Sequence, residues 1–313
     1  MWNTMQIIFP SAIAYTIPLL MGALGGLYSE RSGVTNLCIE GLMLFGVFTG
    51  AVSMLKLQPI IGSDAGIVVG ILIAMVSSTL LALLHGVAAI NLKADQVISG
   101  TAINMLATAL ATYLAQTITG SGNITLTRGI IRANVPFLSK IPIIGPLFFS
   151  STYWTTWVCL GIWALSWFLL YKTSFGLRLR ACGEHPSAVA SAGVKVHKMR
   201  YIGVAASGAL SGLGGACILV TYAGEFNSGS GINGLGFLAV AALIFGQWKP
   251  LGILGSTFFF GLCMTIANVS KVLPGLSNLP TGVLGMFPYV ATLIALILSS
   301  KKSSAPLANG QPF

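Results

Sequence analysis

Long apolar segments separated by short polar ones constrain this chain more than any other feature. Charged residues make up 7% of the sequence and hydrophobic residues 55%, whereas about a quarter of an ordinary soluble domain is charged. So few charges cannot cover a water-exposed surface, and lipid must therefore face much of the chain. Because a bilayer span needs about 20 predominantly apolar residues, the sequence predicts an all-α polytopic membrane protein.

The apolar segments predict about eight to ten transmembrane helices, some of them broken or re-entrant. They form one transmembrane domain over residues 1–300, and residues 301–313 form a short polar tail. The segment 232–247 is short for a full crossing. The expected spans cover residues 5–28, 36–55, 65–91, 95–118, 151–171, 199–222, 232–247, 249–268 and 281–299.

Basic residues set the expected orientation. The loop 172–200 holds the densest group of Lys and Arg, and cytoplasmic loops carry an excess of these residues. This loop and the tail are therefore expected in the cytoplasm. One span earlier, the segment 119–150 becomes an external loop, and with nine spans the N-terminus is external. Three basic residues of 119–150 oppose this assignment, but its length and its Gly, Asn, Thr and Pro content suit an external loop.

The side-chain inventory argues against an enzyme, a metal site and nucleic-acid binding. The three histidines and five cysteines show no metal-ligand spacing, and the chain has no GxSxG, HExxH or Walker-type phosphate loop. The net charge of +10 comes from basic residues in loops between helices, where membrane orientation explains them better than nucleic acid does. We expect no catalytic residue, no metal and no cofactor in this chain.

Two polar, glycine-rich segments interrupt the apolar runs. One is SERSGVTNLCIEG from Ser29, and the other is EFNSGSGING from Glu225. Exposed backbone is costly in the hydrocarbon region, so such breaks persist only inside protein or beside an aqueous cavity. Asn36 and Glu40 would share one face of a helix that begins near Asn36, whereas Glu30 is expected at a water-facing turn with Arg31.

The segments 22–50 and 211–246 resemble each other, since each has a small-residue patch, a polar break and an apolar helix. They would cross the membrane in opposite senses, which suggests an inverted repeat of the kind common in transporters. We therefore expect the two breaks to lie opposite each other beside a solute path. Asp95 is expected to cap the next helix, and the amide of Asn104 either joins helices or contacts the solute. The expected path residues are Asn36, Glu40, Asn104, Asn227 and Asn233.

The cytoplasmic loop contains EHPSAVASAG, which predicts a short helix with Pro186 in its first turn and Gly193 as its end. An isolated helix of this length is marginal in water, so it packs against something. Its small side chains suit insertion into a cleft of a partner protein. The alternative is a loop that folds back on its own helix ends.

The same loop resembles the signature T-x-x-G-x-x-x-R-A-x-G-x-x-x-x-A-A-x-x-x-G of permease subunits in the ribose and nucleoside branch of bacterial ABC importers. ERSGVTNLCIEGLM, NLKADQVISGTAINML and NGLGFLAVAALIFGQWKP resemble other blocks of that family, and the resemblance covers about residues 15–300. The glutamate block is most similar to the nucleoside permeases. The residues that fit the signature here are Gly176, Arg180, Ala181, Gly183, Ala188, Ala190 and Gly193, with Ser187 and Val189 in the alternate slots.

This resemblance implies a subunit of an ATP-driven importer for nucleosides or related purines in the bacterial plasma (inner) membrane. It implies a second related permease chain in a heterodimer, a cytoplasmic ABC ATPase that binds ATP and Mg, and an external substrate-binding protein or lipoprotein. The loop helix would be the coupling helix, and the segment 119–150 would help to receive the binding protein. The residues implied in coupling are Gly176, Arg180, Gly183, Glu184, His185, Pro186, Ser187, Ala188 and Gly193.

Three other functions remain open at this point. The same machinery could carry ribose, another simple sugar or riboflavin. A stand-alone ion-coupled transporter would need titratable groups at the membrane midplane, where Glu40 is the only good candidate. A membrane scaffold without transport would hardly need glycine-rich breaks at membrane depth.

Overall fold

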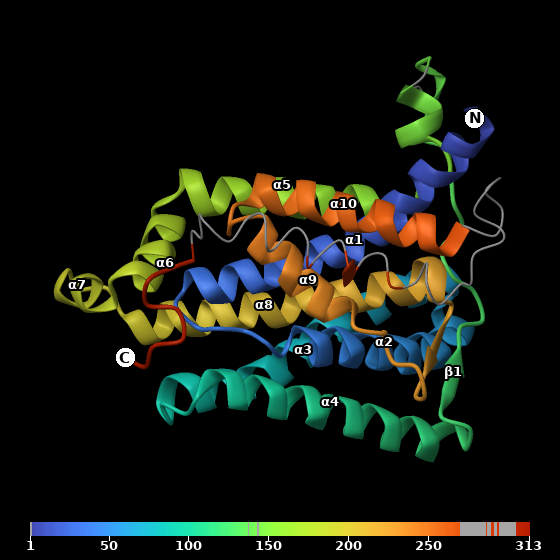
Figure 1. The fold of residues 1–313 in the computed structure, drawn as a ribbon. Helices are drawn as coiled ribbons and strands as arrows, with labels where there is room; N and C mark the ends of the chain where they lie inside the picture. Colours follow the sequence, from blue (N-terminus) through green and yellow to red (C-terminus); the bar gives the residue numbers. More distant parts are fainter. Residues whose placement is uncertain are drawn as a thin grey trace.

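The computed structural model describes residues 2–136, 138–142, 144–269 and 305–313, together with Met286, Tyr289, Val290 and Leu293. Seven helices of this described part are long and apolar enough to cross a membrane, in agreement with the predicted all-α polytopic class (Figure 1). These helices are α1 Trp2–Arg31, α2 Ile39–Ile61, α3 Ser63–Gly86, α4 Gln96–Thr119, α5 Trp154–Lys172, α8 Val196–Ile218 and α10 Pro250–Val269.

The remaining elements are short. The expected span 232–247 is helix α9, whose 11 residues reach about 16 Å at 1.5 Å per residue, about half of a bilayer core. The expected span 281–299 lies outside the described residues apart from four positions. The other short elements are η1 Val87–Asn91, β1 Asn123–Thr125, η2 Leu138–Lys140, η3 Gly145–Phe149, α6 Ser174–Glu184, α7 Pro186–Ser191, η4 Leu219–Ala223, β2 Glu225–Asn227 and α9 Leu235–Phe245.

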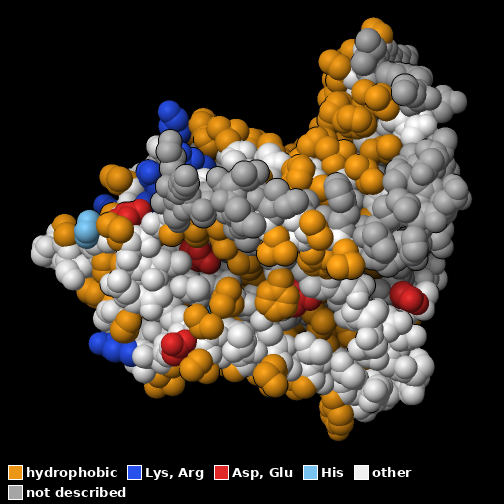
Figure 2. All heavy atoms as spheres, viewed as in Figure 1, with side chains coloured by type: hydrophobic (Ala, Val, Ile, Leu, Met, Phe, Trp, Pro, Cys, Tyr) orange, Lys and Arg blue, Asp and Glu red, His pale blue; other side chains and the backbone are white. Residues whose placement is uncertain are grey.

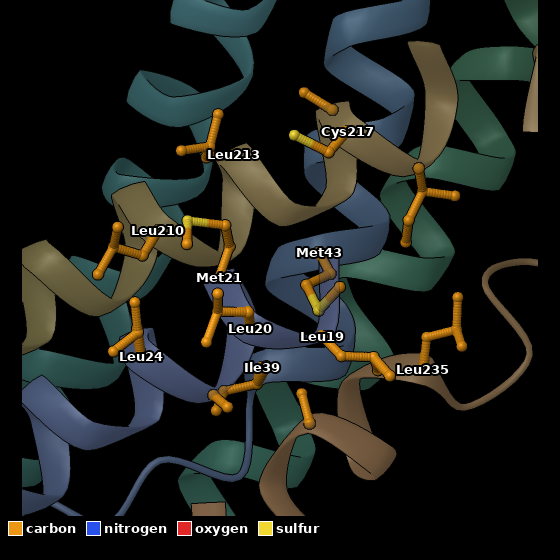
Figure 3. Close-up of a cluster of buried hydrophobic side chains, with 14 of the residues drawn as sticks. Leu19, Leu20, Met21, Leu24, Ile39, Met43, Leu210, Leu213, Cys217 and Leu235 are labelled. Atoms are coloured by element: carbon orange, nitrogen blue, oxygen red, sulfur yellow. The ribbon is translucent and has the colours of Figure 1, made fainter. Parts of the chain in front are cut away.

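Helices α1, α2, α3 and α8 form the centre of the molecule. Helix α8 is the most buried of the seven, because small residues along it let other backbones approach closely. A Cβ on Gly212 would lie 2.5 Å from the carbonyl oxygen of Ala74, and a Cβ on Gly215 would meet that of Met43 even more closely. Figure 3 shows the leucine and methionine side chains of α1, α2 and α8 that fill the space around these contacts.

Helices α4 and α5 lie at the edge of this bundle. In the most apolar 18-residue stretch of each helix, only 28% of the residues are buried. Large side chains such as Met105, Tyr113 and Phe168 are exposed. Since the charge-poor sequence cannot keep such faces in water, they contact lipid or another membrane chain. The orange side chains along the lower edge of Figure 2 belong to this apolar surface.

The helices run alternately between two ends of the molecule. One end carries α6, α7 and residues 305–313, whereas the chain begins at the other (Figure 1). That other end holds the segment 119–150, whose strand β1 pairs antiparallel with β2 in the register Ile124↔Phe226. The segments expected in the cytoplasm and outside therefore lie at opposite ends.

Candidate functional site

The chain between α1 and α2, residues 32–38, is the first break. Side chains from other helices form hydrogen bonds with its backbone N–H and carbonyl groups. The N–H of Thr35 donates to Gln96 Oε1 at 2.7 Å, and its carbonyl lies 3.0 Å from Nε2 of His85. Asp95, as predicted, caps α4 by accepting from the N–H groups of Val97 and Ile98. The break therefore lies inside protein, which is where a non-helical backbone at membrane depth is tolerated.

Asn104 of α4 holds both sides of this break. Its Nδ2 donates to the carbonyl of Leu37 at 2.8 Å, and its Oδ1 accepts from the N–H of Gly41 at 2.7 Å. A Cβ on Gly41 would lie 2.8 Å from the Cα of Asn104, so the glycine permits this close approach. Asn104 thus has the helix-joining role, while its side chain also faces the groove described below.

Asn36 lies in the break and not on α2, which begins at Ile39. The expectation that Asn36 and Glu40 share a helical face is therefore wrong. The Asn36 side chain is fully buried, with Nδ2 donating to Ser207 Oγ at 2.6 Å and Oδ1 accepting from the N–H of Cys38 at 3.0 Å. These bonds hold residues 36–38 in a non-helical turn, so α2 begins at Ile39 and not near Asn36.

Glu40 joins the two breaks. Its carboxylate accepts from the backbone N–H groups of Gly234, Gly236 and Phe237 at 3.0, 2.6 and 3.3 Å, which are the free donors at the start of α9. Such donors and the helix dipole favour a negative charge at this position. A Cβ on Gly236 would lie 2.4 Å from the Cα of Glu40. The two glycine-rich breaks therefore meet, as the sequence predicted.

The remaining two expected path residues lie apart from this contact. Asn227 of β2 accepts from the N–H groups of Gly229 and Ser230 in a tight turn. Asn233 is exposed, has a left-handed backbone with φ +53°, and borders a separate hollow of about 400 Å³ that includes Tyr222. The structure thus brings together Glu40 and Asn104 of the five expected path residues.

A groove of about 610 Å³ lies between α2, α4 and α9, with Glu40 and Asn104 in its wall. Along α4 its wall carries a polar residue at every fourth position, so that these residues form a stripe on one helix face. Of the α4 side chains in this wall, the sequence predicted only Asn104, although the four-residue spacing is visible there. The stripe consists of Asn104, Thr108, Thr112 and Gln116, and the other lining residues are Met105, Ala109, Tyr113, Phe237 and Glu40.

The other end of α1 corrects a second expectation. Glu30 is 4% exposed, and its carboxylate accepts from Trp248 Nε1 and from Asn309 Nδ2. Arg31 donates to the carbonyl of Trp248 at 2.9 Å and to Glu184 at 3.4 Å. The pair does not form a water-facing turn, because α1 continues through Arg31 and the turn between α9 and α10 covers it.

Two glycines of the predicted coupling loop let α6 pack onto the membrane helices. A Cβ on Gly176 would meet the carbonyl oxygens of Leu169 and Leu170 of α5, and a Cβ on Gly183 would lie 2.5 Å from the carbonyl oxygen of Arg31. The guanidinium of Arg180 lies over the ring of Tyr171, 4.5 Å from its centroid. Helix α6 is therefore fixed to α1 and α5.

Helix α7 follows directly and projects from the end of the molecule (Figure 1). As predicted, it begins at Pro186, and the chain leaves it through Gly193, whose φ is +81°. His185, Ser187 and Ala188 are exposed, whereas Val189 is buried in the main hydrophobic core, so one face of α7 packs on the rest of the chain and the other face is exposed.

Comparison of the amino-acid sequence with known proteins identifies a family. Residues 9–297 match the family described as branched-chain amino acid transport system / permease component. The chain belongs to this permease family. It is 41% identical over 310 residues to the guanosine ABC transporter permease NupQ of Bacillus subtilis, covering 99% of this chain and 97% of the relative. No solved structure matches the chain.

Two further relatives carry different names. The nucleoside ABC transporter permease NupC of Lactococcus lactis is 41% identical over 311 residues, with 98% of this chain and 96% of the relative covered. The putative glucose ABC transporter permease TsgC13 of Haloferax volcanii is 32% identical over 300 residues, with 89% and 87% covered. The permease is therefore a multi-pass plasma membrane protein and a transport subunit, not an enzyme. ATP hydrolysis belongs to a partner, and permeases of this kind work with an ATPase and a substrate-binding protein.

Proposed function

We propose that this permease imports nucleosides or related purines by alternating access, driven by a separate cytoplasmic ABC ATPase that binds ATP and Mg. The observation that carries the proposal is the polar stripe of α4 in the groove with Glu40. The side chains of Asn104 and Thr108 already form hydrogen bonds within the chain, whereas the hydroxyl of Thr112 and the amide of Gln116 would be costly to turn toward lipid. A solute path gives these groups partners, because a nucleoside offers hydrogen-bonding atoms along its length.

The rest of the groove suits the other half of such a solute. Met105, Ala109 and Tyr113 flank the stripe on α4, and Phe237 of α9 also lines the groove, so apolar and aromatic surfaces border the polar stripe. Ligand sites commonly combine apolar walls with a few placed polar groups. The names of two relatives with 41% identity, guanosine permease and nucleoside permease, support this substrate class. Asn36, Asn227 and Asn233, also expected on the path, would shape it indirectly, through the breaks that they stabilise.

A simple sugar is the second candidate, because one relative is named a putative glucose permease and the polar stripe would suit sugar hydroxyls. A stand-alone ion-coupled transporter is less well supported. Its one candidate carboxylate, Glu40, already accepts three backbone N–H groups.

A second permease chain is proposed to close the groove. The stripe residues Thr108 and Gln116 are exposed, and only 28% of the residues in the most apolar stretch of α4 are buried in this chain. A related but different chain, as in a heterodimer, would supply the missing wall. The external substrate-binding protein would dock at the end of the molecule that carries residues 119–150.

The coupling surface is proposed to be α7 with the last turn of α6. Its exposed members His185, Ser187 and Ala188 would contact the ATPase. Gly176, Arg180, Gly183 and Glu184 would transmit the motion, because they fix α6 to the membrane helices. Pro186 and Gly193 set the two ends of α7.

The groove is tested with Thr112→Leu, measured as nucleoside uptake into vesicles that contain the whole transporter. We expect uptake to fall by about tenfold, the effect of losing about 1.4 kcal/mol of interaction. Thr117→Leu is the matched control, because Thr117 lies on the same helix, is exposed and does not line the groove. Equal uptake by the two variants would count against the groove as the path.

The coupling surface is tested with Ala188→Arg and Pro186→Asp. Both variants should reach the membrane normally and lose solute-stimulated ATP hydrolysis and uptake. Ala65→Arg is the control, since Ala65 is an exposed alanine in the first turn of α3, at the opposite end of the molecule. Wild-type uptake by Ala188→Arg and Pro186→Asp would exclude α7 as the coupling helix.

A further inference from the structure

Residues 305–313, which we call the tail segment, pack against the loop that carries α7. Ala308 is 4% exposed, and its N–H donates to the carbonyl of Gly183 at 2.8 Å. The N–H of Leu307 donates to Glu184 Oε2 at 3.3 Å. Both acceptors lie in the last turn of α6, immediately before α7. The tail segment is therefore bound to the base of α7.

The same segment reaches the membrane helices. Asn309 Nδ2 donates to Glu30 Oε2 at 3.3 Å, and this carboxylate also accepts from Trp248 Nε1 in the turn between α9 and α10. Arg200 Nη1 of α8 donates to the carbonyl of Gln311 at 3.0 Å. One short segment thus connects the base of α7 with α1, α8 and the end of α9, the helix whose start is held by Glu40.

Arg200 of α8 is a buried cation that contacts the tail segment. It is 1% exposed, and among the described residues its Nε and Nη2 have no hydrogen-bond partner. Its Nη1 donates to the tail segment, and its guanidinium lies 5.9 Å from the ring centroid of Phe313. Because a buried charge is costly without partners, detachment of the tail segment would leave Arg200 unpaired or let water reach it.

A hollow of about 550 Å³ separates α7 from the tail segment. One wall comes from the end of α6 and the start of α7, and the other from the tail segment, so a partner that binds the start of α7 on this side also contacts the tail segment. Leu307 is 67% exposed at this place. The walls consist of Glu184, His185, Pro186, Ser187 and Ala188 on one side and Leu307, Ala308, Gln311, Pro312 and Phe313 on the other.

Charge around this end indicates the chemistry of the partner. Arg178, Lys195 and Lys198 are exposed near α7, whereas Glu184 is already paired with Arg31. Figure 2 shows Lys and Arg gathered at the end of the molecule that carries α6 and α7. A protein with acidic groups around an apolar contact would complement this surface.

We propose that α7 and the tail segment together form the surface that the cytoplasmic ATPase contacts, and that the tail segment transmits the motion of α7 to Glu30 and Trp248. The ATPase places an apolar side chain in the hollow beside Leu307 and acidic side chains toward the surrounding cations. Through Asn309 and Glu30, displacement of α7 then reaches α1 and the α9–α10 turn. This inference rests on the proposed coupling role of α7.

The contact is tested with Leu307→Asp in the complete transporter, measured as the amount of ATPase that remains bound to the permease during purification in detergent. We expect retention about tenfold weaker, as for the loss of about 1.4 kcal/mol of contact. Leu138→Asp is the control, because Leu138 is an exposed leucine in the segment at the opposite end. The milder Leu307→Ser gives a second measurement if the aspartate lowers the membrane level of the permease. Retention equal to wild type in both Leu307 variants would overturn the contact.

The transmission is tested with Asn309→Ala, which removes the amide that donates to Glu30 and leaves Leu307 in place. We expect normal retention of the ATPase with uptake per ATP hydrolysed reduced about fivefold or more, a loss of about 1 kcal/mol of coupling. Wild-type uptake per ATP would overturn the transmission. ATPase retention does not depend on the solute. If wild type retains its ATPase yet takes up no nucleoside, the proposed solute is wrong, while the Leu307 measurement still decides whether the tail segment forms part of the surface.

Discussion

The contact between Glu40 and the start of α9 gives the sharpest prediction. In Glu40→Gln the side chain keeps its length, but one oxygen becomes an NH₂ group that cannot accept. At least one of the three bonds to Gly234, Gly236 and Phe237 must then be lost, and a donor faces a donor.

The magnitude follows from the bonds that are removed. A hydrogen bond to a charged group contributes about 1.5–3 kcal/mol, and a negative charge at a helix start adds about 0.3–1 kcal/mol. The expected loss is therefore about 2–4 kcal/mol. At about 2–4 °C per kcal/mol, the range for domains of about 150–250 residues, Tm should fall by about 5–15 °C.

Thermal unfolding of the purified permease in detergent is monitored by size-exclusion chromatography, which gives Tm. Solute uptake is measured separately, at a temperature well below Tm. Glu225→Gln is the matched control, because the same chemical change is made on an exposed side chain. We expect the control to retain the wild-type Tm. A Tm of Glu40→Gln within about 2 °C of wild type, which corresponds to about 1 kcal/mol or less, would refute the reasoning.

Three further predictions concern close contacts and burial. Gly236→Ala should strongly reduce the yield of folded permease, because its Cβ would lie 2.4 Å from the Cα of Glu40. Gly255→Ala is the control and should express normally, because a Cβ on Gly255 would meet nothing within 4 Å. Equal yields of the two variants would contradict the prediction. Trp248→Phe removes the donor to the buried carboxylate of Glu30 and should lower stability by about 1–3 kcal/mol, visible as a lower Tm, and an unchanged Tm would show that this bond contributes little. Burial raises the pKa of the Cys182 thiol, although nearby Arg200 lowers it in part. Because a raised pKa leaves less thiolate at neutral pH, maleimide labelling of Cys182 at pH 7 should be slower than labelling of free cysteine and should become faster as the pH rises. Labelling of Cys182 at pH 7 as fast as that of free cysteine would contradict this prediction.

Much of the fold could be predicted from composition and local pattern. The seven described spans and the short α9 correspond to the expected apolar segments, with ends that differ by up to six residues. The short helix α7 was predicted correctly from Pro186 and Gly193, because a proline at the first helical position and a glycine after the last are local signals.

The candidate site was harder to predict. Asn36 was assigned to α2 although it lies in the break, because its bond to Ser207 connects residues 171 positions apart. Glu30 was expected in water because no local feature reveals that the indole of Trp248, 218 positions later, covers it. The polar stripe of Thr108, Thr112 and Gln116 was visible in the sequence as a four-residue repeat and was not recognised.

The sequence by itself determined that the chain lies in a membrane, that glycine-rich breaks interrupt its helices and that one loop resembles a coupling segment. These properties depend on the local balance of apolar, charged and small residues, which can be read from the sequence without knowing the fold. Only the tertiary structure decided what each buried polar group does: that Glu40 caps α9, that Glu30 binds Trp248, and that residues 305–313 pack against α6. The physical reason is that a buried polar group must find a partner, and the available partner is chosen by helix packing between segments far apart in the chain.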